Sequence, residues 1–391
     1  MKPIAGADSV TVSRNIERRY GLLRLLRDAG IVIGLSVALM IGVELFVRAF
    51  FPQRLDGTSI QGQRFSVRDP DIGMRYAAGA HWSFTHPEYT VEYVINADGF
   101  RDAKVHPMPK PSGTTRLLLL GDSFTFGQGT NYEDIWPVIV EKHLANTGHR
   151  HIDVVKAGIQ GQNTRSELML MQELIPKYDP DVIVVGFMIN DLYDNSLYGL
   201  EEEKLEADPM GKNGVEDAPE RSWFRTLQRT YVQNSRYSEF HLLSLLRRML
   251  LASDRRYCQL YLASARAEFM IEPWTSEVAQ KIRTTEILFN KMHEYVSSKG
   301  KKFFVFSMPQ QFQVLYPKEF DSTGDINVAS VDRHFSNFAR ENGFKWVSAL
   351  ETFTAAEDPA KLFYRWDGHF TPAGNRVAAD VFMREITPHL N

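Results

Sequence analysis

A serine in a glycine-rich segment is the first residue whose type and setting could do chemistry. Ser123 lies within Gly121 to Gly129, which reads GDSFTFGQG and directly follows the apolar run from Arg116 to Leu120. A serine at the point where a strand turns into a helix lies at the carboxyl edge of a sheet, where open α/β folds bind ligands. A nucleophilic serine also needs a base, a group that orients the base, and donors for the oxyanion.

Three further segments could supply those groups. Lys156 to Thr164 reads KAGIQGQNT, Gly186 to Asp191 reads GFMIND, and Trp366 to Gly374 reads WDGHFTPAG. The first two follow predicted strands, and the third precedes the last predicted helix. The glycine turn at Ser123 could also cradle a phosphate, but it matches neither G-x-x-x-x-G-K-[ST] nor G-x-G-x-x-G, which argues against nucleotide binding.

The four segments, in this order, resemble the conserved blocks of the GDSL or SGNH hydrolase superfamily. They correspond to a GDS nucleophile block, a glycine block, a G-x-x-N-D-like block and a terminal Asp/His block. The resemblance covers about Leu117 to His389, interrupted by one long insertion. It implies ester hydrolysis through a serine nucleophile, without a metal or a cofactor.

The resemblance assigns a role to each matching position. Ser123 matches the nucleophile, and its backbone N–H matches the first oxyanion donor. The N–H of Gly161 and the side-chain amide of Asn190 match the second and third donors. His369 matches the general base, and Asp367 matches the carboxylate that fixes the tautomer of that base.

The match has two departures, and simpler interpretations of its residues exist. Lys156 stands where many members have asparagine. The terminal block is Asp-x-His, where much of the superfamily has Asp-x-x-His. Subgroups with one intervening residue, which include polysaccharide acetylation proteins, look similar to this sequence. Ser123 could instead be a helix N-cap, and Asn190 and Asp367 could be turn residues.

Two acidic residues flank the matching positions. Asp122 and Asp191 are interpreted as groups that organise the local turns by hydrogen bonding. Neither is assigned a direct part in the chemistry.

Short apolar runs that alternate with helical segments predict the elements that position these residues. The alternation predicts an α/β fold, with a parallel sheet and helices on both faces. The resemblance implies three α/β/α layers around a five-stranded parallel sheet of the SGNH, flavodoxin-like kind. The predicted strands are Arg116 to Leu120, Asp153 to Lys156, Val182 to Phe187, Phe303 to Ser307 and Lys345 to Ser348. One helix is expected from about Thr275 to Ser298, and another ends at Asn342-Gly343.

The connection between the third and fourth strands is longer than an ordinary crossover. It contains a predicted helical insertion at about residues 195–275. Glu201 to Glu220 is acidic with proline and glycine, which predicts an exposed loop. Ser222 to Leu262 has apolar residues at helical spacing with interleaved arginines. This second part could be a helical cap on the sheet or a basic amphipathic surface that rests on lipid or a membrane partner.

The apolar run Ala29 to Phe51 is long enough to cross a bilayer. Roughly fourteen large apolar residues, at about −0.3 to −0.6 kcal/mol each, outweigh the cost of Glu44 and Arg48, whose i,i+4 spacing allows them to pair. A buried core helix is the alternative. The preceding arginines place the N-terminus in the cytoplasm by the positive-inside rule; they are Arg14, Arg18, Arg19, Arg24 and Arg27.

The run is predicted to be a retained signal anchor, because it and its leader are long and no small-x-small cleavage site follows. The expected organisation is a cytoplasmic basic leader at 1–28, an anchor at 29–51, a β-rich lead-in at 52–115 and a hydrolase-like domain at 116–391. The catalytic part would then be periplasmic or extracellular, beyond an inner membrane crossed once.

Composition limits the remaining function classes. A net charge of −3 offers no basic field for nucleic acid, and the single cysteine, Cys258, excludes an intramolecular disulfide.

The expected function is an extracytoplasmic serine esterase that acts on an O-acetyl or other acyl ester of a carbohydrate. One alternative is an O-acyltransferase for surface or secreted polysaccharide, working beside a membrane acyl donor. The other is a non-catalytic membrane-anchored scaffold.

Overall fold

The computed structural model describes residues 8–55, 57–61, 65–147, 151–197, 240–320 and 326–390. The chain forms two compact units. One comprises Met1–Leu55 with Ser235–Leu246, and the other comprises Asp56–Asn234 with Arg247–Asn391. The predicted loop at Glu201 to Glu220 lies outside the described residues.

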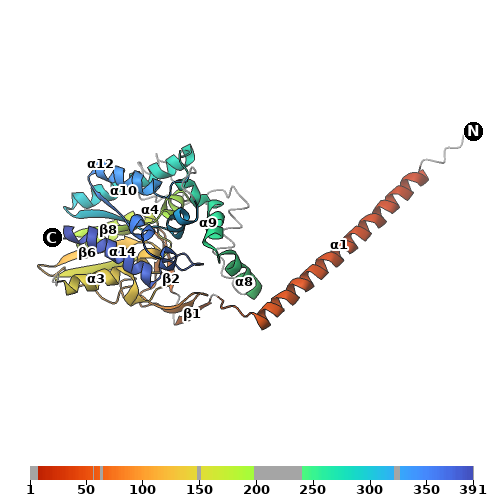
Figure 1. Ribbon diagram of the computed structural model, residues 1–391, viewed down its shortest axis with the longest axis horizontal. Coiled ribbons are helices and arrows are strands. Elements are labelled where there is room, and N and C mark those ends of the chain that lie inside the picture. Colours follow the sequence, from red (N-terminus) through yellow and green to blue (C-terminus); the bar gives the residue numbers. More distant parts are fainter. Residues whose placement is uncertain are drawn as a thin grey trace, which may run out of the picture. The chain divides into compact units, whose positions relative to one another are not determined.

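A five-stranded parallel sheet forms the centre of the larger unit, which confirms the predicted fold class (Figure 1). Its strands are β6 (Thr115–Gly121), β7 (Ile152–Gly158), β8 (Val182–Phe187), β9 (Lys302–Ser307) and β10 (Lys345–Ser348). They run in the order β10-β9-β8-β6-β7. This is the flavodoxin-like order, with the topological switch point between β6 and β8.

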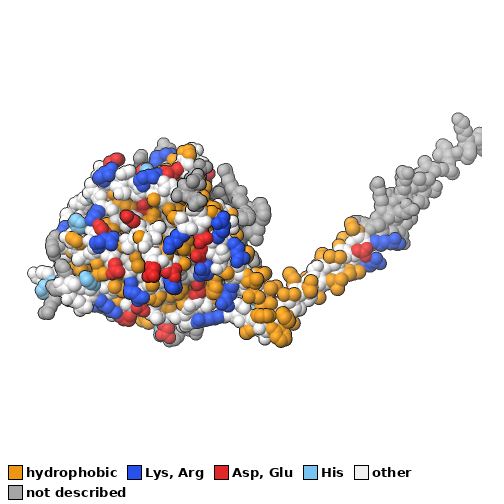
Figure 2. All heavy atoms as spheres, viewed as in Figure 1, with side chains coloured by type: hydrophobic (Ala, Val, Ile, Leu, Met, Phe, Trp, Pro, Cys, Tyr) orange, Lys and Arg blue, Asp and Glu red, His pale blue; other side chains and the backbone are white. Residues whose placement is uncertain are grey.

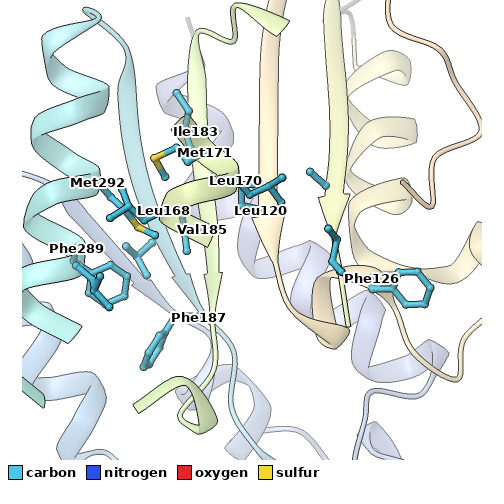
Figure 3. Close-up of a cluster of buried hydrophobic side chains, with 14 of the residues drawn as sticks. Leu120, Phe126, Leu168, Leu170, Met171, Ile183, Val185, Phe187, Phe289 and Met292 are labelled. Atoms are coloured by element: carbon cyan, nitrogen blue, oxygen red, sulfur yellow. The ribbon is translucent and has the colours of Figure 1, made fainter. Parts of the chain in front are cut away.

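Alternating side chains of the strands enter two separate cores, one on each face of the sheet. Leu118 and Leu120 of β6 lie in one core, and Leu117 and Leu119 lie in the other; all four are fully buried. Figure 3 shows part of the first core, where Leu120, Val185 and Leu168 come together from two strands and a helix. Burial on both faces explains why these strands read as continuous apolar runs.

Helices cover both faces of the sheet (Figure 1). One face carries α4 (Thr164–Tyr178), α10 (Ser276–Ser298) and α12 (Ser330–Asn342), and the other carries α3 (Trp136–Asn146) and α14 (Pro372–Glu385). The remaining described helices of this unit are α2 (Ser123–Phe126), α5 (Asn190–Leu197), α9 (Asp254–Leu262), α11 (Gln311–Glu319) and α13 (Leu350–Thr354). As the sequence predicts, α12 ends at Asn342, where Gly343 adopts a left-handed conformation with φ of 79°.

A single long helix, α1 (Asp8–Phe50), forms most of the smaller unit. From Arg24 to Phe50 it is long and apolar enough to cross a membrane. Figure 2 shows apolar side chains along much of this helix. The same unit contains the first residues of α8 (His241–Leu250), which begins within the predicted insertion.

The segment between α1 and the parallel sheet is rich in β-structure. Its strands are β1 (Gly57–Gln61), β2 (Ser66–Asp69), β3 (Gly73–Tyr76), β4 (His81–Thr85) and β5 (Thr90–Val94). We refer to residues 56–114 as the lead-in. In β5 buried and exposed residues alternate, as expected for a strand with one face on a core.

A buried ionic network joins the lead-in to the parallel sheet. His106 lies between Asp153 of β7, at 2.8 Å, and Asp102, at 3.0 Å. Lys156 of β7 also bonds Asp102, at 3.0 Å, and Arg116 of β6 bonds Asp153, at 2.7 Å. Burial by itself lowers the pKa of His106, but its two carboxylate partners outweigh burial and raise that pKa. This explains the lysine in the glycine block, because Lys156 serves the docking of the lead-in.

Candidate active site

A row of glycines makes room for the turn that carries Ser123. Gly121 of β6 pairs in register with Gly158 of β7 and with Gly186 of β8. A Cβ on Gly121 or Gly186 would lie 2.1 or 2.5 Å from the Oγ1 atom of Thr125, and one on Gly158 would lie 2.4 Å from the backbone nitrogen of Phe126. The helix α2 therefore packs directly against the ends of three strands.

Asp122, and not Ser123, is the N-cap of α2. Its Oδ1 atom accepts a hydrogen bond of 2.9 Å from the backbone N–H of Phe124. The alternative in which Ser123 caps the helix is therefore wrong, and the Ser123 hydroxyl makes a different contact.

The Ser123 hydroxyl begins a chain of two hydrogen bonds. Its Oγ atom lies 2.7 Å from Nε2 of His369, and Nδ1 of His369 lies 2.8 Å from Oδ2 of Asp367. With the ring proton on Nδ1, the serine donates to the imidazole and the imidazole donates to the carboxylate. Phe124 packs against the His369 ring, with 4.7 Å between the ring centroids. The structure thus brings together the three residues that the sequence predicts as nucleophile, base and orienting acid.

Electrostatics favour a proton transfer from the serine to His369. Burial alone raises the pKa of Asp367, but the charge and hydrogen bond of His369 outweigh burial and lower it. Burial alone lowers the pKa of His369, but Asp367 and then Asp122 outweigh burial and raise it above its ordinary value of 6.5. A carboxylate that stays ionised beside a more basic imidazole stabilises the imidazolium that forms when the serine loses its proton.

Glu88 of the lead-in holds the backbone on either side of Trp366. Its carboxylate accepts hydrogen bonds from the N–H groups of Arg365, Trp366 and Asp367, at 2.6, 2.9 and 3.1 Å. Three bonds to one half-buried carboxylate fix the main chain that carries the orienting acid. Sequence reasoning missed Glu88, because it lies outside all four motifs.

A second set of contacts reaches the other oxygen of Asp367. Gln128 donates to Oδ1 of Asp367 at 3.3 Å and accepts a 2.6 Å bond from Gln160. Gln160 in turn accepts from the hydroxyl of Tyr76 at 2.8 Å. The nucleophile block, the glycine block and the lead-in therefore meet at this carboxylate. Gln128 and Gln160 lie within quoted motifs, but their spacing gave no sign of this contact.

Arg101 of the lead-in holds the loop that follows α2. Its guanidinium donates to the carbonyl oxygens of Phe126, Gly127 and Thr130, at 3.0, 2.8 and 2.7 Å. It is 2% exposed and lies 4.7 Å from the centre of the Tyr93 ring. Burial lowers the pKa of Arg101 to about 10, so the side chain remains a cation at neutral pH.

The three predicted oxyanion donors lie at the carboxyl ends of neighbouring strands. Ser123 begins α2 after β6, Asn190 begins α5 after β8, and Gly161 lies in the turn after β7 with φ of 77°. Asn190 hydrogen bonds Asp122, the residue before the serine, and accepts a 3.3 Å bond from Gln310. Gly161 is placed less directly, through the pairing of Gly158 with Gly121. A Cβ at Gly161 would meet no atom within 4 Å, so its left-handed backbone, and not crowding, favours glycine here.

Three buried carboxyl groups lie beneath these turns. Burial raises the pKa of Asp122 to about 6. Burial, and then the proximity of Asp122, raises the pKa of Glu167 well above its ordinary range, and burial with Glu167 does the same for Asp191. Asp191 accepts a 3.2 Å hydrogen bond from Thr164. Asp122 therefore bonds its own turn, as predicted, whereas Asp191 bonds Thr164 at the start of α4, 27 residues earlier in the chain.

The chain was compared with known protein families. Residues 119–267 match the GDSL-like Lipase/Acylhydrolase family, which confirms the resemblance predicted from the motifs. The matched range contains Ser123, Gly161 and Asn190, whereas Asp367 and His369 lie beyond it. An arylesterase of Vibrio mimicus is 29% identical over 76 residues, which are 19% of this chain and 38% of that protein. The match thus spans well under half of that relative.

Among solved structures, the chain is similar to a crystal structure of TesA, with 14% identity, a TM-score of 0.39, and coverage of 71% of this chain and 100% of that one. It is also similar to the acetyl xylan esterase AlAXEase, with 13% identity, a TM-score of 0.41, and coverage of 70% and 100%. A catalytic mutant of an acetylxylan esterase from Geobacillus stearothermophilus gives 16% identity, a TM-score of 0.40, and coverage of 71% and 96%.

The three backbone hydrogen bonds to Glu88 lead to a prediction. Glu88→Gln replaces one acceptor oxygen with an NH2 group that faces backbone N–H groups, so the Asp367 backbone should shift. We expect kcat for a small activated ester to fall about a hundredfold with KM unchanged, because Glu88 orients the base and does not line the substrate position. Glu92→Gln, on the same lead-in but 65% exposed, is the matched control and should leave kcat unchanged. Equal rates for the two variants would contradict the positioning role.

Proposed function

We propose that the chain is a membrane-anchored serine esterase that hydrolyses acyl esters through an acyl-enzyme on Ser123. The observation that carries the proposal is the chain of hydrogen bonds from Ser123 through His369 to Asp367. The family match over residues 119–267 adds support, because it covers the nucleophile in a family of acylhydrolases.

The first half of the reaction forms the acyl-enzyme. His369 removes the proton from the Ser123 hydroxyl as Oγ attacks the ester carbonyl. Negative charge develops on the carbonyl oxygen, where the N–H groups of Ser123 and Gly161 and the amide of Asn190 would stabilise it. The tetrahedral intermediate collapses when His369 gives its proton to the departing alcohol, which leaves the acyl group on Ser123.

The second half releases the acid. Water gives a proton to His369 and attacks the acyl carbonyl, and the same three donors stabilise the second tetrahedral intermediate. Collapse returns the proton to Ser123 and frees the carboxylic acid. Asp367 stays ionised throughout and holds the imidazole in the required tautomer.

The substrate that we propose is an O-acetyl or other acyl ester of a carbohydrate. The Asp-x-His spacing of Asp367 and His369 supports this, because it resembles the subgroups that include polysaccharide acetylation proteins. The same resemblance favours a second candidate, an O-acyltransferase in which a sugar hydroxyl replaces water and a membrane partner supplies the acyl group. Two rates distinguish the functions: the rate of acetyl transfer to an added glycan and the rate of hydrolysis of the acetyl donor. Faster transfer indicates an acyltransferase, and faster hydrolysis indicates an esterase. A non-catalytic scaffold would have no need of the hydrogen-bonded serine and histidine.

The proposed location is an inner membrane crossed once, with the N-terminus in the cytoplasm and the catalytic domain in the periplasm or outside the cell. The length and apolar character of α1 from Arg24 to Phe50 support a retained anchor. The arginines before and at the start of this span support the orientation. On this proposal, the bilayer is a partner of residues 29–51.

Labelling by a fluorophosphonate probe tests the nucleophile. We expect rapid phosphonylation of the wild-type chain on Ser123, no labelling of Ser123→Ala, and slow labelling of His369→Ala, because the base activates the serine. Ser276→Ala, an exposed serine at the start of α10, is the matched control and should label like wild type. Undiminished labelling of Ser123→Ala, or none of the folded wild-type chain, would overturn the proposal.

The pH dependence of the reaction tests the coupling of His369 to Asp367. His369 must be neutral to accept a proton, and its pKa is raised above 6.5, so kcat/KM should fall as the pH drops through a value above 6.5. Asp367→Asn removes the charge that raises this pKa. The acid limb should then move to lower pH, and the rate above it should fall roughly 10³- to 10⁴-fold because the tautomer is no longer held. An unmoved limb would mean that another group controls it.

A further inference from the structure

The helix α8 carries an apolar stripe, part of which is exposed in the portion of the chain that the structure describes. At about 100° per residue, its large apolar residues fall within roughly 160° of arc; they are Leu242, Leu243, Leu245, Leu246, Met249 and Leu250. Three of them are strongly exposed, Leu246 at 46%, Met249 at 57% and Leu250 at 51%, and Phe240 just before the helix is 46% exposed. Large apolar side chains gathered on one helix face in this way mark an interaction surface.

The polar side of α8 contacts Trp366. Arg247 donates to the carbonyl oxygen of Trp366 at 2.8 Å, and the guanidinium of Arg248 lies 4.7 Å from the centre of the Trp366 ring. A helix on a water-soluble protein normally turns its apolar face inward and its charges outward. In α8 the arginines contact protein, and Leu246, Met249 and Leu250 face outward, which is the arrangement expected for a helix that lies on lipid.

The start of α8 is bonded to the candidate membrane-spanning helix. The carboxylate of Glu44 in α1 accepts hydrogen bonds from the N–H groups of His241 and Leu242, at 3.0 and 2.8 Å, and lies 3.6 Å from Arg48. The backbone N–H of Gln53 also donates to Nδ1 of His241, at 2.8 Å. These bonds give the acidic residue of the apolar run its partner, because the first N–H groups of a helix need acceptors and attract negative charge.

The position of Glu44 sets the depth of this junction. It lies six residues before Phe50, the end of α1, or about 9 Å along the helix axis. If the span crosses a bilayer, Glu44 therefore lies near the outer boundary between acyl chains and headgroups. The first turn of α8 begins at that boundary, where an amphipathic helix can bury one face in lipid while its backbone ends stay near water.

We propose that α8 lies in the outer headgroup region of the bilayer that α1 crosses, with Leu246, Met249 and Leu250 on the acyl chains. This inference rests on the proposed membrane anchoring and adds a second lipid contact that is separate from the span.

Site-directed fluorescence in vesicles tests the proposal on the full chain. A polarity-sensitive dye is attached to Leu246→Cys or Met249→Cys, and the labelled protein is reconstituted in phosphatidylcholine and phosphatidylglycerol with a nitroxide near the top of the acyl chain. Native Cys258 is fully buried and should not label. Leu39→Cys in α1 serves as the membrane control, and exposed Glu341→Cys on α12 serves as the aqueous control.

We expect dyes at 39, 246 and 249 to be quenched about twofold or more beyond the dye at 341, because quenching requires contact with acyl chains. Quenching at 39 with none at 246 and 249 would overturn the lipid contact of α8 and leave the anchor intact. A blue-shifted but unquenched dye at 246 would show instead that protein covers the face, which also overturns the proposal. No quenching at 39 would mean that the anchor itself fails.

Folding of the labelled variants is checked by activity. Leu246 and Met249 lie outside the catalytic machinery, so Leu246→Cys and Met249→Cys should hydrolyse a soluble ester at the wild-type rate. The double variant Leu246→Glu with Met249→Glu, carrying the dye at Phe240→Cys, should lose the quenching seen at 240 in the parent. Retained quenching there would contradict burial of this face in lipid.

Discussion

The hydrogen bond between Ser123 and His369 is the constraint on which the rest of the structure depends. It joins residues that are 246 positions apart in the chain across 2.7 Å. An angstrom of misplacement between such groups can cost about a hundredfold in rate. Two loops that are far apart in the sequence must therefore be held in register, and the sheet, the glycine row and the lead-in all contribute to that.

The nucleophile loop is held by the sheet and by the lead-in, and the base loop is held by the lead-in. The nucleophile turn lies on Gly121, Gly158 and Gly186, and Arg101 binds the carbonyl groups that follow it. The base loop precedes α14, and Glu88 binds its backbone N–H groups. The buried Arg101 cation binds acceptors on one loop, and the half-buried Glu88 carboxylate binds donors on the other. The lead-in therefore positions both loops.

The strands of the parallel sheet and the residues of the four motifs could be predicted from the sequence, because each depends on a short stretch of neighbouring residues. The strand Val182–Phe187 was predicted with its actual bounds, because a strand buried on both faces reads as an apolar run between turn residues. The bounds of Lys345–Ser348 were also predicted correctly. The hydrogen-bonded residues Ser123, Asp367 and His369 could be predicted because each lies in a distinctive motif. Their roles in catalysis remain predictions.

The contacts made by the lead-in could not be predicted, because they depend on where distant segments meet. Glu88 and Arg101 bind backbone atoms, and a backbone partner leaves no mark in the sequence of the partner segment. Glu44 is a similar case, because its acceptor role became visible only once the start of α8 was placed beside it. The sequence shows that these charged residues lie outside the four motifs, but nothing in it indicates which backbone groups they bind.

The most direct test of a serine nucleophile is the identification of the acetyl-enzyme on Ser123. The chain is mixed with an activated acetyl ester, quenched in acid within the first turnover, and digested for mass spectrometry. We predict one acetyl group on the peptide that contains Ser123, formed before the acid is released and absent when the ester is omitted. Ester hydrolysis at the same rate with no acetyl group on Ser123 would contradict the account.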